Sequence, residues 1–192
     1  MKKIIYLTPF LLILSLAAAA SGQKETYTGT VLSYGTGLNT RTYTAPFTLI
    51  IDRQTSDQRA QSLLGLLQEG NQNTLLNAVR QEDVGSFSIG GRIGPRVNVV
   101  REHMVDGRMR IFAAFERWKN FGELRGGYRS LDYPFGVIEL YIDPRTGKGE
   151  GTYVAAAQVR WNRDKKSGQN QIEIENFATF PAKLMGVTRR GR

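Results

Sequence analysis

The sequence contains no cysteine and a single histidine, His103, among its 192 residues. The lack of cysteine excludes disulfides, thiolate catalysis, cysteine-ligated zinc and iron–sulfur clusters. One histidine excludes a metal site built from a histidine cluster, and no serine lies in a Gly-x-Ser-x-Gly nucleophile elbow. His103 lies shortly before a predicted hairpin turn, where a solvent-facing strand position is the favoured interpretation. We therefore expect no catalytic triad, no metal site and no cofactor.

Long apolar runs are confined to the first twenty residues. Two lysines at positions 2–3 precede an apolar segment at 4–16, and three alanines follow at 18–20. This order is typical of a signal peptide that is cleaved before Ser21. An uncleaved membrane anchor is the alternative, but the run is shorter than the ~20 residues that a span requires and contains Pro9. We therefore expect a secreted or periplasmic protein with no transmembrane span in the mature chain.

Acidic residues are outnumbered by basic ones. The chain has 26 Lys and Arg against 17 Asp and Glu, a net charge of +9, and the mature chain would keep 24 basic residues and a charge of +7. The basic residues are spread along the chain, which favours a role in solubility. The alternative is attraction to an anionic envelope surface or polysaccharide, which an exported protein meets more readily than nucleic acid.

The longest period-2 pattern lies between residues 136 and 177 and predicts three antiparallel strands joined by polar turns. The first of these strands is residues 137–142. The second, 152–161, is predicted to place five side chains on one face: Tyr153, Ala155, Ala157, Val159 and Trp161. In the third, Ile172 and Ile174 are expected in the core, with Glu173 and Glu175 facing solvent.

Further strands are predicted at residues 26–34, 42–51, 85–91, 97–105, 108–118 and 182–187. Asp106-Gly107 predicts a type I′ hairpin turn. Pro46 removes a donor from the sheet, so that part of its strand is expected at an edge or a bulge. The last five residues, 188–192, are expected to form a loose basic tail.

Between residues 56 and 82 the apolar period becomes helical. Leu63, Leu64 and Leu67 form one stripe that we expect to be buried, and Gly70 is suited to end the helix. Thr55 and Gln58 fit a capping box, with Ser56 and Asp57 as other N-cap candidates. A shorter helix is expected to start at Asn73 or Thr74.

These patterns predict a β-dominated α+β fold in one domain, residues 21–192. An antiparallel sheet forms a sandwich or a partly closed barrel, and an inserted helical hairpin at about 56–82 packs on it.

Two other features of the sequence suggest a possible phosphate site or catalytic site. The glycines at 147–151 resemble a phosphate-binding loop but open a strand, whereas such a loop must open a helix. Four acidic residues could serve a paired-carboxylate glycosidase: Asp132, Glu139, Glu173 and Glu175. The sequence does not place any two of them at the required separation.

The aromatic segment before residue 136 is the one candidate binding site. Tyr128, Arg129 and Tyr133 combine large contact areas with hydrogen-bonding tips, and two glycines precede them. The alternative is that Tyr133 and Phe135 pack under the sheet edge as core residues.

The missing catalytic constellations favour an exported, non-catalytic binding or interaction module. Its ligand would be a small apolar molecule held in a barrel mouth beneath the helices, or an anionic envelope surface or polysaccharide. The alternative is a carboxylate-dependent hydrolase acting on an envelope or extracellular polysaccharide. The sequence specifies neither the ligand nor the oligomeric state.

Overall fold

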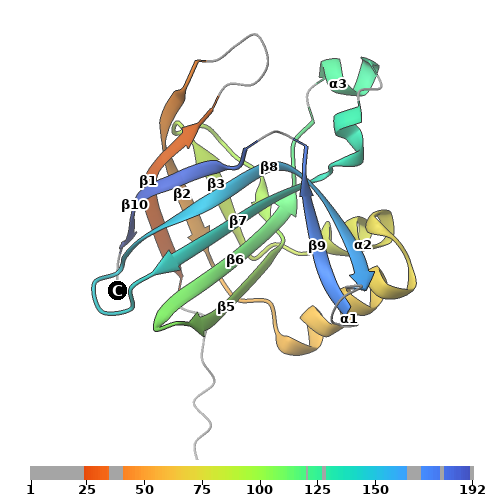
Figure 1. Ribbon diagram of the computed structural model, residues 1–192, viewed down its shortest axis with the longest axis horizontal. Coiled ribbons are helices and arrows are strands. Elements are labelled where there is room, and N and C mark those ends of the chain that lie inside the picture. Colours follow the sequence, from red (N-terminus) through yellow and green to blue (C-terminus); the bar gives the residue numbers. More distant parts are fainter. Residues whose placement is uncertain are drawn as a thin grey trace, which may run out of the picture.

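A computed structural model describes residues 24–34, 41–119, 121–126, 129–163, 170–177 and 180–190 (Figure 1). Antiparallel strands dominate this part of the chain, and a helical pair is inserted between the second and third strands. In chain order the elements are β1 (Glu25–Ser33), β2 (Tyr43–Ile51), α1 (Asp57–Glu69), α2 (Gln72–Val79), β3 (Gly85–Ile89), β4 (Arg96–Val97), β5 (Val99–Val105), β6 (Arg108–Glu116), α3 (Phe121–Gly126), the 3-10 helix η1 (Arg129–Asp132), β7 (Phe135–Ile142), β8 (Lys148–Arg163), β9 (Asn170–Asn176) and β10 (Ala182–Arg190). The predicted β-dominated α+β class with an inserted helical hairpin is confirmed.

The described strands form a single sheet that nearly closes into a barrel. Their order is β4-β3-β2-β1-β10-β8-β7-β6-β5, and β9 pairs with the far half of β8. The two ends of this order, β4 and β5, are separated in the chain by one residue, Asn98. One bent stretch of chain therefore pairs with β3 before Asn98 and with β6 after it, which brings the sheet round on itself. Of the two predicted architectures, the structure adopts the nearly closed barrel.

Asn98 holds this bend with bonds from both backbone and side chain. Its backbone N–H donates to the Ala114 carbonyl at 3.0 Å, and its Nδ2 donates to the Glu82 carbonyl at 2.8 Å. Its Oδ1 accepts from the backbone N–H of Glu116 at 2.9 Å. The residue is almost fully buried, so these bonds satisfy groups that water cannot reach.

Thr55 makes a second set of bonds at the seam, the place where the two ends of the sheet meet around Asn98. Its N–H donates to the Val100 carbonyl at 2.9 Å, and its hydroxyl accepts from the Val100 N–H at 3.0 Å. Because this hydroxyl is occupied, the N-cap of α1 is Ser56, whose Oγ accepts from Arg59 N–H at 3.2 Å. The predicted capping box with Thr55 is therefore wrong, and the second cap candidate is the one used.

The barrel interior is filled by side chains. A cluster of aromatic rings lies across it, with Phe87 between Phe47 and Phe115 and in contact with Tyr153. Gly136 makes room for this cluster, since a Cβ at that position would lie 2.2 Å from Cε2 of Phe115. The interior is therefore a packed core, and the barrel mouth is not where the helices lie.

The helical hairpin instead packs on the outer face of the sheet, beside β8 and β9 (Figure 1). A second apolar cluster forms there from both elements: Leu63, Leu67, Leu76 and Val79 of the helices with Phe135, Val137, Ala157 and Val159 of β7 and β8. Leu64 is only partly buried, which corrects the expectation that the whole leucine stripe is covered. The second helix begins at Gln72 because Asn71 caps it, one to two residues earlier than predicted.

A register shift in β8 divides its side chains between the two cores. Phe135 of β7 pairs with Ala157, but Val137 pairs with Val154, so β8 contains one extra residue between these positions. Tyr153 consequently packs inside the barrel, whereas Ala157 lies outside it under the helices. The prediction that all five alternating residues of this strand share one face is wrong, because a bulge reverses the alternation.

Two local predictions are confirmed. Asp106 and Gly107 have φ values of 50° and 75°, the two positive angles that a type I′ turn requires. The pairing of β2 with β3 ends at Phe47, so Pro46, the preceding residue, lies outside that pairing. The Pro46 carbonyl accepts from the Gly90 N–H. One prediction at the other end of the chain is wrong: β10 continues through Arg190, so residues 188–190 are strand and not a loose tail.

Candidate functional site: an apolar cleft beside the helical hairpin

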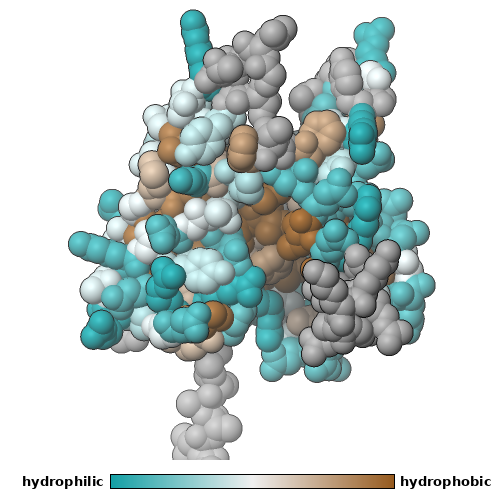
Figure 2. Space-filling view, viewed as in Figure 1, coloured by the Kyte–Doolittle hydropathy of each residue, from teal (hydrophilic) through white to brown (hydrophobic). Residues whose placement is uncertain are grey.

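An apolar cleft of about 340 Å³ lies between the helical hairpin and the outer face of the sheet. Three groups of side chains line it: Leu63, Leu64 and Leu67 from α1, Phe112, Phe135 and Val137 from β6 and β7, and Val159, Ile172 and Ile174 from β8 and β9. Figure 2 shows hydrophobic side chains gathered in a hollow on this face of the molecule. The second core cluster thus continues into a cleft that is open to solvent.

Ile172 and Ile174 form the outer wall of this cleft. Their side chains are 51% and 38% exposed, so the prediction that they are core residues is wrong. They lie on β9, which pairs with β8 from Ala157, the last residue paired with β7, through Arg163. This hairpin therefore stands away from the barrel and presents its isoleucines to the cleft.

Specific bonds fix the walls of the cleft. The side-chain amide of Gln72, at the start of α2, accepts from Val159 N–H at 2.9 Å and donates to the Asp132 carbonyl at 2.8 Å. At the other end of α2, Arg80 donates two bonds to Glu116 on β6, at 2.6 and 2.7 Å. These bonds to Arg80 lower the pKa of the Glu116 carboxyl. Both ends of α2 are thus attached to the sheet, which holds the cleft open in a defined shape.

Polar side chains are few among the cleft's lining residues, and Arg101 is the charged one. Its Nη1 donates to the Thr55 carbonyl at 2.8 Å, and its Nη2 pairs with Asp57 in the first turn of α1. Gln61 lies one helical turn after Asp57 and also lines the cleft. The cleft therefore has an apolar interior and a polar rim at one end.

The predicted binding residues lie elsewhere. Tyr128 is outside the described residues, and Arg129 is exposed at the start of η1. Tyr133 is buried: its hydroxyl donates to Glu175 at 2.6 Å, and its ring lies against Phe177. The hydrogen bond to Glu175 raises the pKa of the Tyr133 hydroxyl, and Arg129 is close enough to oppose that effect. Neither Arg129 nor Tyr133 lines the apolar cleft.

The four candidate carboxylates lie on three elements, η1, β7 and β9. Asp132 is exposed on η1, and Glu139 on β7 pairs with Arg110. Glu175 on β9 accepts from Tyr133 and pairs with Arg160 at 3.3 Å, and Arg160 is also the cross-strand partner of Glu173. None of these four acids lines the apolar cleft.

Glu25 on β1 and Glu102 on β5 form a different acidic pair, which sequence reasoning missed. Burial raises the pKa of Glu102, and the charge of Glu25 raises it further. Glu25 accepts from the hydroxyl of Tyr27 and pairs with Arg189. Neither glutamate lines the apolar cleft.

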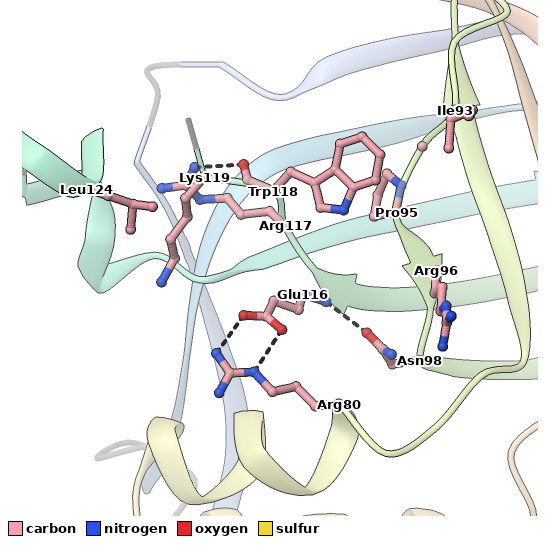
Figure 3. Close-up of a pocket in the computed structure, with 11 residues that line it drawn as sticks. Arg80, Ile93, Pro95, Arg96, Asn98, Glu116, Arg117, Trp118, Lys119 and Leu124 are labelled. Carbon is pink, nitrogen blue, oxygen red and sulfur yellow. Dashed lines mark hydrogen bonds and ion pairs between the residues drawn. The ribbon is translucent and has the colours of Figure 1, made fainter. Parts of the chain in front are cut away.

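A second, wider cavity of about 790 Å³ lies between α2, α3 and the end of β6 (Figure 3). Arg80, Arg96 and Arg117 line it, but each faces a carboxylate: Glu116, Asp83 and Glu123, respectively. Arg117 also donates to the carbonyls of Ser130 and Tyr133, both at 2.6 Å. Arg80 and Arg117 are thus engaged in bonds within the chain, whereas the Arg96–Asp83 pair is exposed. The lining of this cavity is more polar than that of the apolar cleft, which is the better candidate site for an apolar ligand.

The described ranges offer neither a metal-binding cluster nor a membrane-spanning helix. That part of the chain contains no group of three or more His, Asp or Glu side chains placed to hold a metal ion. It also contains no helix with the length and hydrophobicity needed to cross a membrane.

Sequence reasoning missed Arg101, Ile172 and Ile174 as site residues. Alternation correctly predicted the strand at 170–176, but alternation does not reveal whether another element covers its apolar face. In comparisons with known proteins, no family model, no curated protein and no solved structure matches this chain.

Proposed function

We propose that this protein is an exported, non-catalytic binding protein that holds a small apolar molecule in the cleft beside its helical hairpin. The observation that carries the proposal is the open cleft of about 340 Å³ with Ile172 and Ile174 exposed along it. Exposed apolar surface that is concave and rimmed by polar groups is typical of a ligand site.

The size of the cleft supports a small molecule as occupant. An apolar cavity of about 150 Å³ holds benzene, and ligand pockets range from about 300 to 1,000 Å³. At about 340 Å³ the cleft lies at the lower end of that range. The bonds of Gln72 and Arg80 fix the position of α2 on the sheet, so binding requires little reorganisation of this wall.

Titration with N-phenyl-1-naphthylamine, a neutral fluorescent probe, tests the proposal. We expect saturable binding of one probe per chain. Replacing the exposed wall, in the double variant Ile172→Ser and Ile174→Ser, should weaken probe binding by about tenfold or more, because the apolar contacts are lost. Met185→Ser is the matched control, since Met185 is 41% exposed and does not line the cleft. Absence of saturable binding, or equal losses in the two variants, would refute the proposal.

Export is a separate part of the proposal, supported by the basic, apolar and small-residue regions within residues 1–20. N-terminal sequencing of protein recovered from outside the cytoplasm should begin near Ser21. Recovery of chains that still begin at Met1 would overturn this part and leave the binding proposal unaffected.

A further inference from the structure

Arg101 stands at the junction between the apolar interior of the cleft and its polar rim. On β5 it lies two residues after Val99, which places both side chains on the same face of the strand. Its cross-strand partner is Phe112, which lines the cleft, and Arg101 lines it too. A cationic fork is therefore fixed beside an apolar surface.

The present partners of Arg101 leave it able to accept a further anion. Its two bonds within the described part of the chain, to the Thr55 carbonyl and to Asp57, use two of the five donors that a guanidinium carries. The Asp57 side chain is 83% exposed, so this ion pair is a weak surface pair that a competing carboxylate can replace. A guanidinium prefers a planar anion that it can bind through two parallel bonds.

Resting on the binding function proposed above, we propose that the ligand is a long-chain carboxylate, with its chain in the cleft and its carboxylate on Arg101. Charge complementarity selects an anion over a cation, and the apolar walls select a hydrocarbon chain. Scaled from the cavity of about 150 Å³ that holds the six carbons of benzene, a volume of about 340 Å³ accommodates roughly fourteen carbon atoms, enough for a twelve-carbon chain. The chain occupies the space lined by Leu64, Ile172 and Ile174, and the headgroup remains at the solvent-facing rim.

The test compares two probes with the same twelve-carbon chain, dodecanoate and dodecanol, by calorimetry and by displacement of the neutral fluorescent probe. We expect wild type to bind dodecanoate about tenfold or more tighter than dodecanol, because only the acid forms charge-assisted bonds. Arg101→Gln should remove this preference, because it weakens dodecanoate binding far more than dodecanol binding. Arg108→Gln is the control, since Arg108 is an exposed arginine that pairs with Glu150 away from the cleft.

The Asp57→Asn variant provides a second test, which does not depend on whether an Arg101 variant folds. Without the competing carboxylate, Arg101 should bind dodecanoate several-fold more tightly, and dodecanol binding should not change. Equal affinity of wild type for the two probes would overturn the carboxylate proposal while leaving the apolar binding function in place. Failure of dodecanoate, dodecanol and the fluorescent probe to bind would overturn both.

Discussion

Leu67→Ala measures how strongly the helical hairpin is attached to the barrel. The Leu67 side chain is 4% exposed and belongs to the cluster that α1 and α2 form with β7 and β8. Removing its Cγ and two Cδ atoms from such a site costs about 3 kcal/mol, within the range of about 2–5 kcal/mol for buried leucines. For a domain of this size the melting temperature should fall by roughly 6–12 °C.

Leu64→Ala is the matched comparison on the same helix. Leu64 is partly buried and faces the open cleft, so its removal enlarges a space that already exists and should cost only about 1 kcal/mol. Urea unfolding followed by far-UV circular dichroism measures both variants, and the slope of the transition should be the same in each. Trp161 packs against the same cluster, so its fluorescence should report the same transition.

The contrast between the two leucines is the informative result. A loss under about 0.5 kcal/mol for Leu67→Ala would mean that the hairpin does not pack on the sheet. Equal losses for Leu64 and Leu67 would mean that the cleft beside Leu64 is closed in solution, and the binding proposal would lose its site.

Three further substitutions probe the barrel. Asn98→Ala should cost about 2–3 kcal/mol, because it leaves buried backbone groups at the seam without partners. Gly136→Ala should cost about 1–3 kcal/mol, because the added Cβ forces the buried Phe115 ring to move. Glu102→Gln should raise the melting temperature near neutral pH. Burial and the charge of Glu25 raise the pKa of Glu102 in the folded protein. Wild type therefore loses stability as the pH rises from the ordinary pKa of glutamate through this raised pKa.

Each of these predictions has its own control. Asn98→Asp retains the acceptor for the Glu116 N–H but turns a carboxylate toward the Glu82 carbonyl, so it should be strongly destabilising at neutral pH and less so at low pH, where the protonated carboxyl can donate; a cost independent of pH would contradict the role given to these bonds. Gly91→Ala is unsuited as a control for Gly136 because its φ is 70°, whereas Gly65→Ala has open space around it and should be neutral or stabilising. For Glu102→Gln the gain over wild type should shrink and disappear as the pH falls below about 4.3, the ordinary pKa of glutamate, because the carboxyl then becomes protonated in the unfolded state as well as in the folded one. A gain independent of pH would contradict the electrostatic explanation.

Elements and local turns could be predicted from the sequence because their causes are local. The Asp106-Gly107 turn depends on two positive φ angles, and the strand at 135–142 on alternating side chains. The helical stripe of Leu63 and Leu67 likewise follows from a 3.6-residue period. In each case neighbouring residues alone determine the conformation.

The closure of the sheet was not available in the same way. It depends on Asn98, which satisfies groups on two segments that are remote in the chain, Glu82 before it and Ala114 and Glu116 after it. A buried asparagine between two apolar residues has no periodic signature. The choice between a sandwich and a barrel therefore required the three-dimensional structure.

The cleft itself follows from the bulge in β8, which explains why no periodicity predicted it. Without the extra residue, Ala157 and Val159 would continue the face of Tyr153 and point into the barrel. With it, the far half of β8 presents apolar residues outward, and these need a cover that the sheet does not supply. The helical hairpin covers Ala157 and Val159 but not Ile172 and Ile174 of the next strand. The uncovered remainder of that outward apolar face is the site at which we expect a ligand.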